Sequence, residues 1–151
     1  MPNLQIQDPD FENRVRDSFG RQVAMSSLGI SISTIAPGRI ELQMPFLSEF
    51  TQQHGFTHAG IITTGLDSAC GYAAFSLMPS DAAVLTVELK TSLLAPAKGE
   101  RYRLVGQVVK PGRTLTFCEG KAYAIDHDHE TLVSTMSATM MTVQHRDNIQ
   151  G

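Results

Sequence analysis

The spacing of apolar residues changes along the chain, from a helical period in its middle to an alternating period after it. Between Gln52 and Leu77, a polar lead-in precedes a run of apolar or small residues at helical spacing. These residues are Ile61, Ile62, Leu66, Ala69, Cys70, Ala73, Ala74 and Leu77. Their i, i+3, i+4 spacing predicts one helix of about five turns with a single buried stripe.

The opposite face of this predicted helix is small or polar. Its residues are Gly60, Thr63, Thr64, Asp67 and Gly71. Asp67 is the one charged residue in the helical run. A glycine inside a helix costs roughly 1 kcal/mol relative to alanine, so Gly65 and Gly71 predict a close approach by another backbone. We therefore expect a sheet against the apolar face and a partner against the small face.

The first residues predict a second helix. Asp8 suits an N-cap and Pro9 suits the first helical position. Apolar residues follow at i+4 steps, at Phe11, Val15, Phe19 and Val23. This pattern predicts a surface helix that ends near Ser26 and Ser27. We expect residues 1–27 to pack on one domain formed by residues 28–151.

The remaining runs alternate between apolar and polar residues, which predicts strands. Two runs, Leu28–Ile32 and Ile40–Met44, flank the turn signal Pro37-Gly38 and predict a hairpin. Four further runs are Val84–Leu94, Arg101–Lys110, Thr114–Ile125 and Thr131–Val143. The separators between these long runs are short, which predicts antiparallel neighbours. The fold class is therefore α+β, with about six antiparallel strands around one long helix.

Composition narrows the class of protein. The 151 residues are 42% hydrophobic and 18% charged, with a net charge of −3 and no basic run, so nucleic-acid binding lacks electrostatic support. No apolar stretch approaches the ~20 residues of a membrane span, so no membrane association is expected. Cys70 and Cys118 fall in the predicted helix stripe and a strand, which favours buried free thiols in a reducing, cytoplasmic setting.

The sequence contains only weak patterns for a metal site or for a Ser-His-Asp catalytic triad. His54 and His58 are four residues apart but lack a third ligand. The acidic stretch from Asp126 to Glu130 is better explained as a solvated hairpin tip. Ser92 and Ser134 have no His and Asp context. We expect neither a metal nor a redox cofactor.

A set of motifs in the second and third quarters of the chain resembles a known family. The motifs are Thr57-His58-Ala59-Gly60, then Asp67, then Thr86-Val87-Glu88-Leu89, Leu94-Ala95-Pro96-Ala97 and Val109-Lys110-Pro111-Gly112-Arg113-Thr114. Their order and spacing resemble the hotdog-fold acyl-CoA thioesterases, in the PaaI-like and 4-hydroxybenzoyl-CoA thioesterase branch. The resemblance covers roughly Leu28 to Val143. It implies a hotdog fold and hydrolysis of acyl-CoA, with coenzyme A as part of the substrate.

The resemblance also implies roles for four residues. Asp67 matches the family's acidic residue, eight positions after the first glycine of its His-Gly-Gly motif, which is Ala59 here. The backbone N–H of Ala59 would polarise the thioester carbonyl, although the chain has His-Ala-Gly in place of His-Gly-Gly. Gln52 matches an amide that orients the water or the thioester, and Thr86 matches a hydroxyl residue that contacts the water. Ordinary polar roles stay open for Gln52 and Thr86.

Elementary chemistry supports these assignments. Backbone N–H groups at a helix N-terminus are unpaired and lie at the positive end of the dipole, so Ala59 and Gly60 offer oxyanion donors. An aspartate can act as a base for water or as a nucleophile. Eight residues of helix span about 12 Å, too far for Ala59 and Asp67 of one chain to act on one carbonyl. We therefore expect a shared site in a homodimer, and the resemblance implies a homotetramer.

Other residues are candidates for substrate binding. His58 and Gly60 lie at the start of the predicted helix. For His58, the alternative to substrate binding is a structural role, in which it bonds the backbone around the turn. Lys90, Lys110 and Arg113 are candidates for the phosphates of coenzyme A, and exposed strand-end charges are the alternative. Two rival functions remain open: an acyl-CoA-binding module without catalysis, and a hotdog hydratase or dehydratase.

Overall fold

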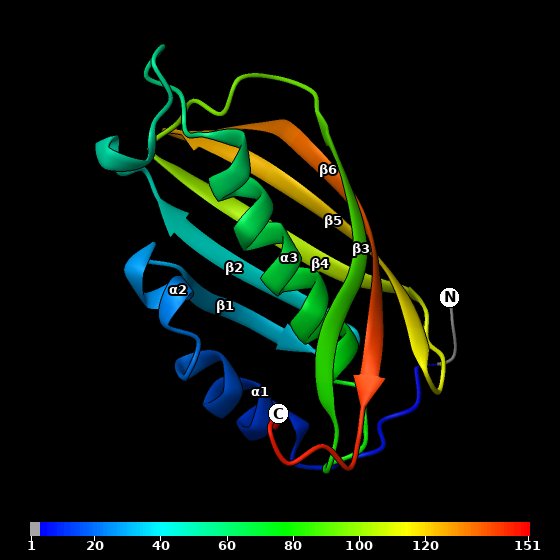
Figure 1. The fold of residues 1–151 in the computed structure, drawn as a ribbon. Coiled ribbons are helices and arrows are strands. Elements are labelled where there is room, and N and C mark those ends of the chain that lie inside the picture. Colours follow the sequence, from blue (N-terminus) through cyan, green and yellow to red (C-terminus); the bar gives the residue numbers. More distant parts are fainter. Residues whose placement is uncertain (1–3) are drawn as a thin grey trace.

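A six-stranded antiparallel sheet curls around one long helix in the computed structural model, which describes residues 4–151 (Figure 1). The strands are β1 (Ser31–Ala36), β2 (Arg39–Pro45), β3 (Ala83–Leu93), β4 (Arg101–Lys110), β5 (Leu115–Asp126) and β6 (His129–Val143). Their order in the sheet is β1-β2-β4-β5-β6-β3. The helices are α1 (Phe11–Gly20), α2 (Val23–Ser27) and α3 (Ala59–Phe75), with a 3-10 turn at Ser48–Phe50. The α+β hotdog architecture expected from the sequence is confirmed.

Helix α3 is the predicted central helix, with 17 residues. Its small apolar stripe packs into the curl of the sheet, against β2, β4 and β5. Leu66, Ala69 and Cys70 are fully buried there. Ser68 and Tyr72 on another side of the helix are buried too, because α1 lies against that side. The side of the helix that carries Ser68 and Tyr72, next to the small face, is therefore covered by the chain itself.

The close approaches to α3 differ from the predicted ones. A Cβ added at Gly65 would overlap the side chain of Leu104, so a side chain and not a backbone comes close there. A Cβ added at Gly71 would have no neighbour within 4 Å among the described residues. The backbone contact is made at Gly106 of β4, where an added Cβ would overlap the backbone of Ala69 and Cys70.

The predicted N-terminal helix starts later and is interrupted. Helix α1 starts at Phe11 after the N-cap residue Asp10, and residues 21–22 separate it from α2. Asp8 instead accepts hydrogen bonds from the Asp10 N–H at 3.0 Å and from Arg14 Nε at 2.8 Å. A proline between two acidic residues, Asp8 and Asp10, leaves both as candidate N-caps, so the sequence pattern did not locate the helix start.

Arg14 attaches α1 to the C-terminal end of α3. Its guanidinium donates to the carbonyls of Phe75, Met78 and Pro79, at 2.8–3.1 Å, and lies over the Phe75 ring. Burial lowers the pKa of Arg14, and the neighbouring Asp8 carboxylate opposes that effect. These bonds join α1 to the end of α3 and to the segment that directly follows it.

One predicted strand pairing is wrong. β3 and β4 are consecutive and were expected to be neighbours, but β3 pairs with β6 and β4 pairs with β2 and β5. The connection after Leu93 crosses one end of the sheet, so β3 becomes an edge strand (Figure 1). The hairpins β1–β2, β4–β5 and β5–β6 are confirmed. In residues 4–151, none of the helices has the length and apolarity needed to cross a membrane.

The Gly106 contact leads to a stability prediction. Gly106→Ala places a methyl group on the α3 backbone, so we expect overpacking to lower the free energy of unfolding by about 1–3 kcal/mol or more. The measurement is the unfolding midpoint in denaturant. Gly20→Ala is the matched control, because an added Cβ there has no neighbour within 4 Å. Equal midpoints for the two variants would contradict the close contact.

Candidate active site

Asp67 and Thr86 form the first element of the site. Asp67 lies half-buried on α3, and Thr86 lies on β3 where that strand passes the helix. The Thr86 hydroxyl donates to Asp67 Oδ1 at 2.7 Å. Oδ2 has no hydrogen-bond partner in the part of the chain that the structure describes. The hydroxyl therefore orients the carboxylate and leaves one oxygen available for chemistry.

A bulge in β3 follows directly after Thr86. Thr86 pairs with Met140 of β6, and the register shifts before Glu88 pairs with Thr139. The extra residue changes which side chains face the helix, a common device next to functional sites. Thr86 therefore faces α3, whereas the next paired residue, Glu88, accepts a hydrogen bond from Thr139.

A cavity of about 290 Å³ lies beside this pair, and we call it the Asp67 cavity. Its lining residues are Ser18, Arg21, Gln22, Asp67, Ser68, Gly71, Tyr72, Phe75, Val84, Thr86, Gln150 and Gly151. Gln22 Oε1 accepts a hydrogen bond from Ser68 Oγ at 3.2 Å. Ser18 Oγ and Tyr72 Oη are also 3.2 Å apart and share one hydrogen bond. This cavity thus combines a carboxylate and a guanidinium, from Asp67 and Arg21, with several neutral polar groups.

The N-terminus of α3 forms the second element. His58 is the N-cap residue, and its Nδ1 accepts from the Gly60 N–H at 2.9 Å. Its structural role is therefore observed, and the Gly60 N–H is already occupied. The Ala59 N–H has no acceptor within the described residues. Ala59 has no positive φ, so alanine in place of glycine causes no backbone strain there.

Gln52 lies beside Ala59. Its side-chain oxygen accepts from the His54 N–H within the turn that precedes α3, which leaves its amide NH₂ available. A cavity of about 490 Å³, which we call the Ala59 cavity, is lined by both residues. Its other lining residues are Phe56, Thr57, Ile62, Leu93, Leu94, Ala95, Pro96, Ala97, Val133 and Ser134. This second cavity is mainly apolar.

Within one chain, the Asp67–Thr86 pair lies apart from the Ala59–Gln52 pair. The Asp67 cavity and the Ala59 cavity have no lining residue in common. Ala59 and Asp67 are eight residues apart on the same helix, which corresponds to about 12 Å. The structure therefore brings Asp67 to Thr86 and Gln52 to Ala59, but it does not bring one pair to the other.

The three predicted phosphate-binding residues lie outside both cavities. Lys90 lies on the outer face of the sheet, beside Glu119 and Lys121. Lys110 is exposed at the end of β4. Arg113 follows in the β4–β5 connection and lines a different cavity of about 400 Å³. Within one chain, none of the three is near Asp67 or Ala59.

Both thiols are buried and free, as expected. Cys118 Sγ donates to the Cys70 carbonyl at 3.5 Å. Burial raises the pKa of Cys70 well above its ordinary value and raises the pKa of Cys118 to about 12. A thiol must lose its proton to act as a nucleophile, so neither cysteine is placed for that role.

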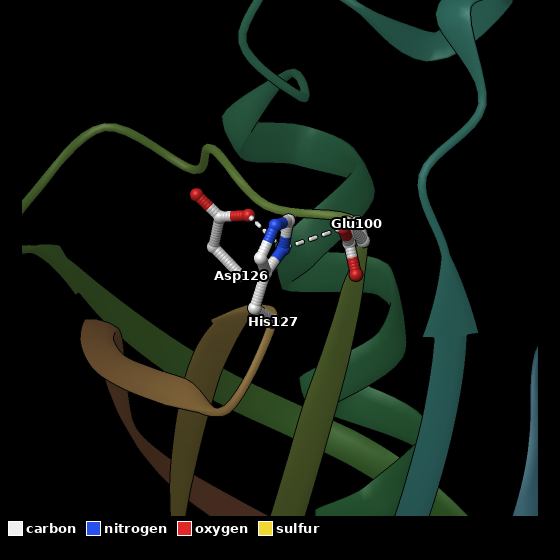
Figure 2. Close-up of side chains that lie close together, drawn as sticks. All are labelled: Glu100, Asp126 and His127. Carbon is white, nitrogen blue, oxygen red and sulfur yellow. Dashed lines mark ion pairs between the residues drawn. The ribbon is translucent and has the colours of Figure 1, made fainter.

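The acidic stretch after β5 is an exposed hairpin tip, as predicted. Asp126 pairs with His129 across the turn, and all the residues from Asp126 to Glu130 are exposed. Figure 2 shows His127 Nδ1 facing two carboxylates, at 2.9 Å from Glu100 Oε1 and 3.2 Å from Asp126 Oδ1. One nitrogen shared by two exposed carboxylates is the geometry of a surface ion pair, so we assign no metal site to it.

The sequence reasoning missed the residues opposite Asp67. Ser18 and Gln22 lie on or after α1, and their approach to α3 depends on tertiary packing. One local signal was present, because Ser68 and Tyr72 lie four residues apart beside Asp67 and form one polar row on α3. Burial raises the pKa of Tyr72, and the hydrogen bond with Ser18 opposes the shift.

Comparison with known proteins identifies similar chains. Residues 54–130 match the model of the thioesterase superfamily, and they include Ala59, Asp67 and Thr86 but not Gln52. A crystal structure of a thioesterase family protein from Silicibacter pomeroyi is 56% identical, with a TM-score of 0.88, over 89% of this chain and 99% of that one. The Escherichia coli PaaI protein of the phenylacetic acid degradation operon has the same fold, at 15% identity and a TM-score of 0.80, over 92% and 96% of the two chains.

Curated relatives are more distant. A protein from Halobacterium salinarum, provisionally named an esterase, is 33% identical over 100 residues, which are 63% of this chain and 66% of the relative. A provisionally named esterase from Saccharolobus solfataricus is 30% identical over 61% of this chain and 65% of its own length. The chain thus spans just under two thirds of the length of each of these relatives.

The buried thiols lead to a reactivity prediction. At pH 8 the thiolate forms of Cys70 and Cys118 are suppressed by their raised pKa values, so we expect no reaction with an aromatic disulfide reagent in the native protein. In denaturant both thiols should react. The measurement is the absorbance of the released thiolate. Rapid labelling of the native protein would contradict the burial of these groups.

Proposed function

Because the chain belongs to the thioesterase superfamily, we propose that it hydrolyses acyl-CoA thioesters to a free acid and coenzyme A. The observation that carries this proposal is the hydrogen bond from Thr86 to Asp67 Oδ1, with Oδ2 left free beside a cavity. The unpaired Ala59 N–H at the N-terminus of α3 adds the expected donor for a developing oxyanion.

The chemistry uses these groups in a defined order. In the base-assisted route, Asp67 Oδ2 takes a proton from water while the water oxygen bonds to the thioester carbon. Negative charge then develops on the carbonyl oxygen, where the Ala59 N–H and the dipole of α3 stabilise it. The carbon–sulfur bond breaks, and the sulfur takes the proton to release coenzyme A. Direct attack by Asp67, followed by hydrolysis of the anhydride, is the alternative within the same geometry.

Two polar residues position the reactants in this scheme. Thr86 holds the carboxylate through Oδ1, so Oδ2 keeps one orientation. Gln52 lines the same cavity as Ala59 and keeps its amide NH₂ without a partner among residues 4–151, so we assign to it the orientation of the water or the thioester. His58 Nδ1 is occupied as a helix cap, which disfavours the hydratase alternative that needs a catalytic histidine.

The site needs two chains. Ala59 and Asp67 of one chain are separated by about 12 Å of helix, whereas an oxyanion donor and a base must act on one carbonyl group. β3 is a long edge strand with exposed apolar residues, including Val87 at 49% and Leu93 at 61% exposure. Edge strands of this kind invite pairing with a second strand. We place a second copy across a two-fold axis at β3, with Ala59 of one chain opposite Asp67 of the other.

Further association into a homotetramer has support on the outer face of the sheet. Val109, Leu115 and Phe117 are exposed there, near the β4–β5 connection. Lys90, Lys110 and Arg113 lie around the same face and remain proposed contacts for the phosphates of coenzyme A in the assembly. The two free thiols fit the reducing cytosol, which we propose as the site of action.

The direct test is release of thiol from a panel of short, long and aryl acyl-CoA thioesters. Hydrolysis of at least one member supports the thioesterase. Tight binding of an acyl-CoA without thiol release would instead support the binding-module alternative.

The role of Asp67 gives a kinetic prediction. Asp67→Asn removes the base or nucleophile, so we expect kcat to fall by at least ~10²-fold with the fold retained. Thr86→Val should lower kcat less, because it removes only the positioning hydroxyl. Thr86→Ser keeps a hydroxyl, so its kcat should stay closer to that of the wild type than the kcat of Thr86→Val. Asp17→Asn makes the same change on an exposed residue of α1 and should keep wild-type kcat. Wild-type kcat for Asp67→Asn would remove Asp67 from the mechanism.

The shared site gives a complementation prediction. Asp67→Asn and Ala59→Trp chains should each be inactive, because one lacks the acid and the other blocks the Ala59 cavity. After subunit exchange, each mixed dimer should contain one intact site, so about a quarter of wild-type activity is expected in a random mixture of C2 dimers. The recovered activity is measured as the rate of thiol release before and after subunit exchange. Mixed dimers that stay inactive, or an active monomer in sedimentation, would rule out the shared site.

A further inference from the structure

The wall of the Asp67 cavity opposite the acid comes from outside the family-matched residues. Residues 54–130 match the family and supply Asp67, Ser68, Tyr72 and Thr86. The facing wall is made by Ser18, Arg21 and Gln22, with Gln150 and Gly151 near the C-terminal end. Figure 1 shows this end of the chain lying beside α1. The proposed chemistry therefore comes from the family-matched residues, whereas one wall of the cavity comes from other parts of the chain.

Gln22 is a half-buried polar side chain of this wall that has unused bonding capacity. It bonds Ser68 through one atom of its amide, at 3.2 Å. The other polar atom of the amide has no partner among residues 4–151. Whichever way the amide is turned, one end is held by Ser68 and the other is left for a ligand. Gln22 is thus oriented by α3 but not satisfied by it.

A second neutral polar pair lies in the same cavity. Ser18 Oγ and Tyr72 Oη share one hydrogen bond, and hydroxyl groups can form more than one. Because burial raises the pKa of Tyr72, its hydroxyl stays protonated at neutral pH and can both donate and accept. The end of a group that enters this cavity would therefore meet neutral hydrogen-bonding atoms, with the Arg21 guanidinium, which donates to the Gly151 carbonyl, also in the lining.

The size of the cavity decides which part of a thioester can end there. A cavity of roughly 150 Å³ holds a benzene molecule. The Asp67 cavity has about 290 Å³, enough for a short acyl group but not for the nucleotide of coenzyme A. The coenzyme A arm must continue to the surface, so the acyl group is the part that ends beside Gln22.

We propose that Gln22 is a specificity-determining residue, which selects short acyl groups that carry a hydrogen-bonding atom, such as a hydroxyl, at their far end. This inference rests on the proposed thioesterase function and adds the chemical class of its acyl group. An unsubstituted alkyl chain would leave the free end of the Gln22 amide buried without a partner. Such an unpaired polar group weakens binding, and sites use this penalty to reject analogues.

The test compares two substrates that differ by one hydroxyl, hexanoyl-CoA and ω-hydroxyhexanoyl-CoA. For the wild type we expect kcat/KM to favour the hydroxylated substrate by about 3- to 10-fold, the value of one neutral hydrogen bond. Gln22→Leu should abolish or reverse that ratio. Ser68→Ala should lower it in part, because Ser68 orients the Gln22 amide. Gln107→Leu, the same change on the exposed face of β4, should keep the wild-type ratio.

The outcomes separate this inference from the proposed function. Hydrolysis of both substrates with no preference, or with the same ratio in the wild type and Gln22→Leu, would overturn the role of Gln22 and leave the thioesterase intact. Absence of thiol release from any acyl-CoA would overturn the thioesterase. In that case, the dissociation constants of the same two substrates for wild type and Gln22→Leu, measured by calorimetry, test the subsite. If the ratio of the two dissociation constants were the same for the wild type and for Gln22→Leu, the proposed role of Gln22 would be overturned.

Discussion

The contact between the backbones of α3 and β4 is the constraint on which the rest of the structure depends. Gly106 has no side chain, so the strand can lie against Ala69 and Cys70 of the helix. This distance is possible only because the helix stripe is also small. The sheet can then curl closely around one face of α3, which leaves another part of the helix to face β3 and α1. Asp67 is two residues from Ala69 and lies at that boundary, half-buried beside Thr86. The position of the acid is therefore a consequence of the packing of the core.

The same helix carries both halves of the proposed chemistry but holds them apart. Its N-terminus provides an unpaired amide at Ala59, and its middle provides a carboxylate at Asp67. A rigid helix of this length cannot bring the two together, so the proposed chemistry requires a second copy of the chain. The exposed apolar edge strand β3 lies beside the acid and offers the surface on which a second copy would complete the site.

The segments outside the family-matched region build on this core. Arg14 attaches α1 to the last residue of α3 and to Met78 just beyond it, and Gln22, which follows α1, lies against Ser68. A change at Gln22 can therefore alter the cavity without altering the hydrogen bond between Thr86 and Asp67. In the proposed function, separation of this kind would let the acyl preference vary while the chemistry is retained, which is the physical basis for assigning the two properties to different residues.

The sequence by itself determined the elements whose causes are local. The helical period of α3 and the turns of three hairpins depend on residues a few positions apart, and they were predicted correctly. The predicted strand run Leu28–Ile32 was wrong in its bounds, because β1 is Ser31–Ala36. The nearness of Gln52 and Ala59 is also local, because one turn separates them. The partner of β3, the contact at Gly106 and the approach of Gln22 to Ser68 were decided by the tertiary structure. Each joins segments that are distant in the sequence, and a periodic pattern shows that a surface is apolar or small without showing which surface covers it. The pair of Asp67 and Thr86 lies between these cases: the family motifs indicated both residues, but only the curl of the sheet around α3 brought the hydroxyl to the carboxylate.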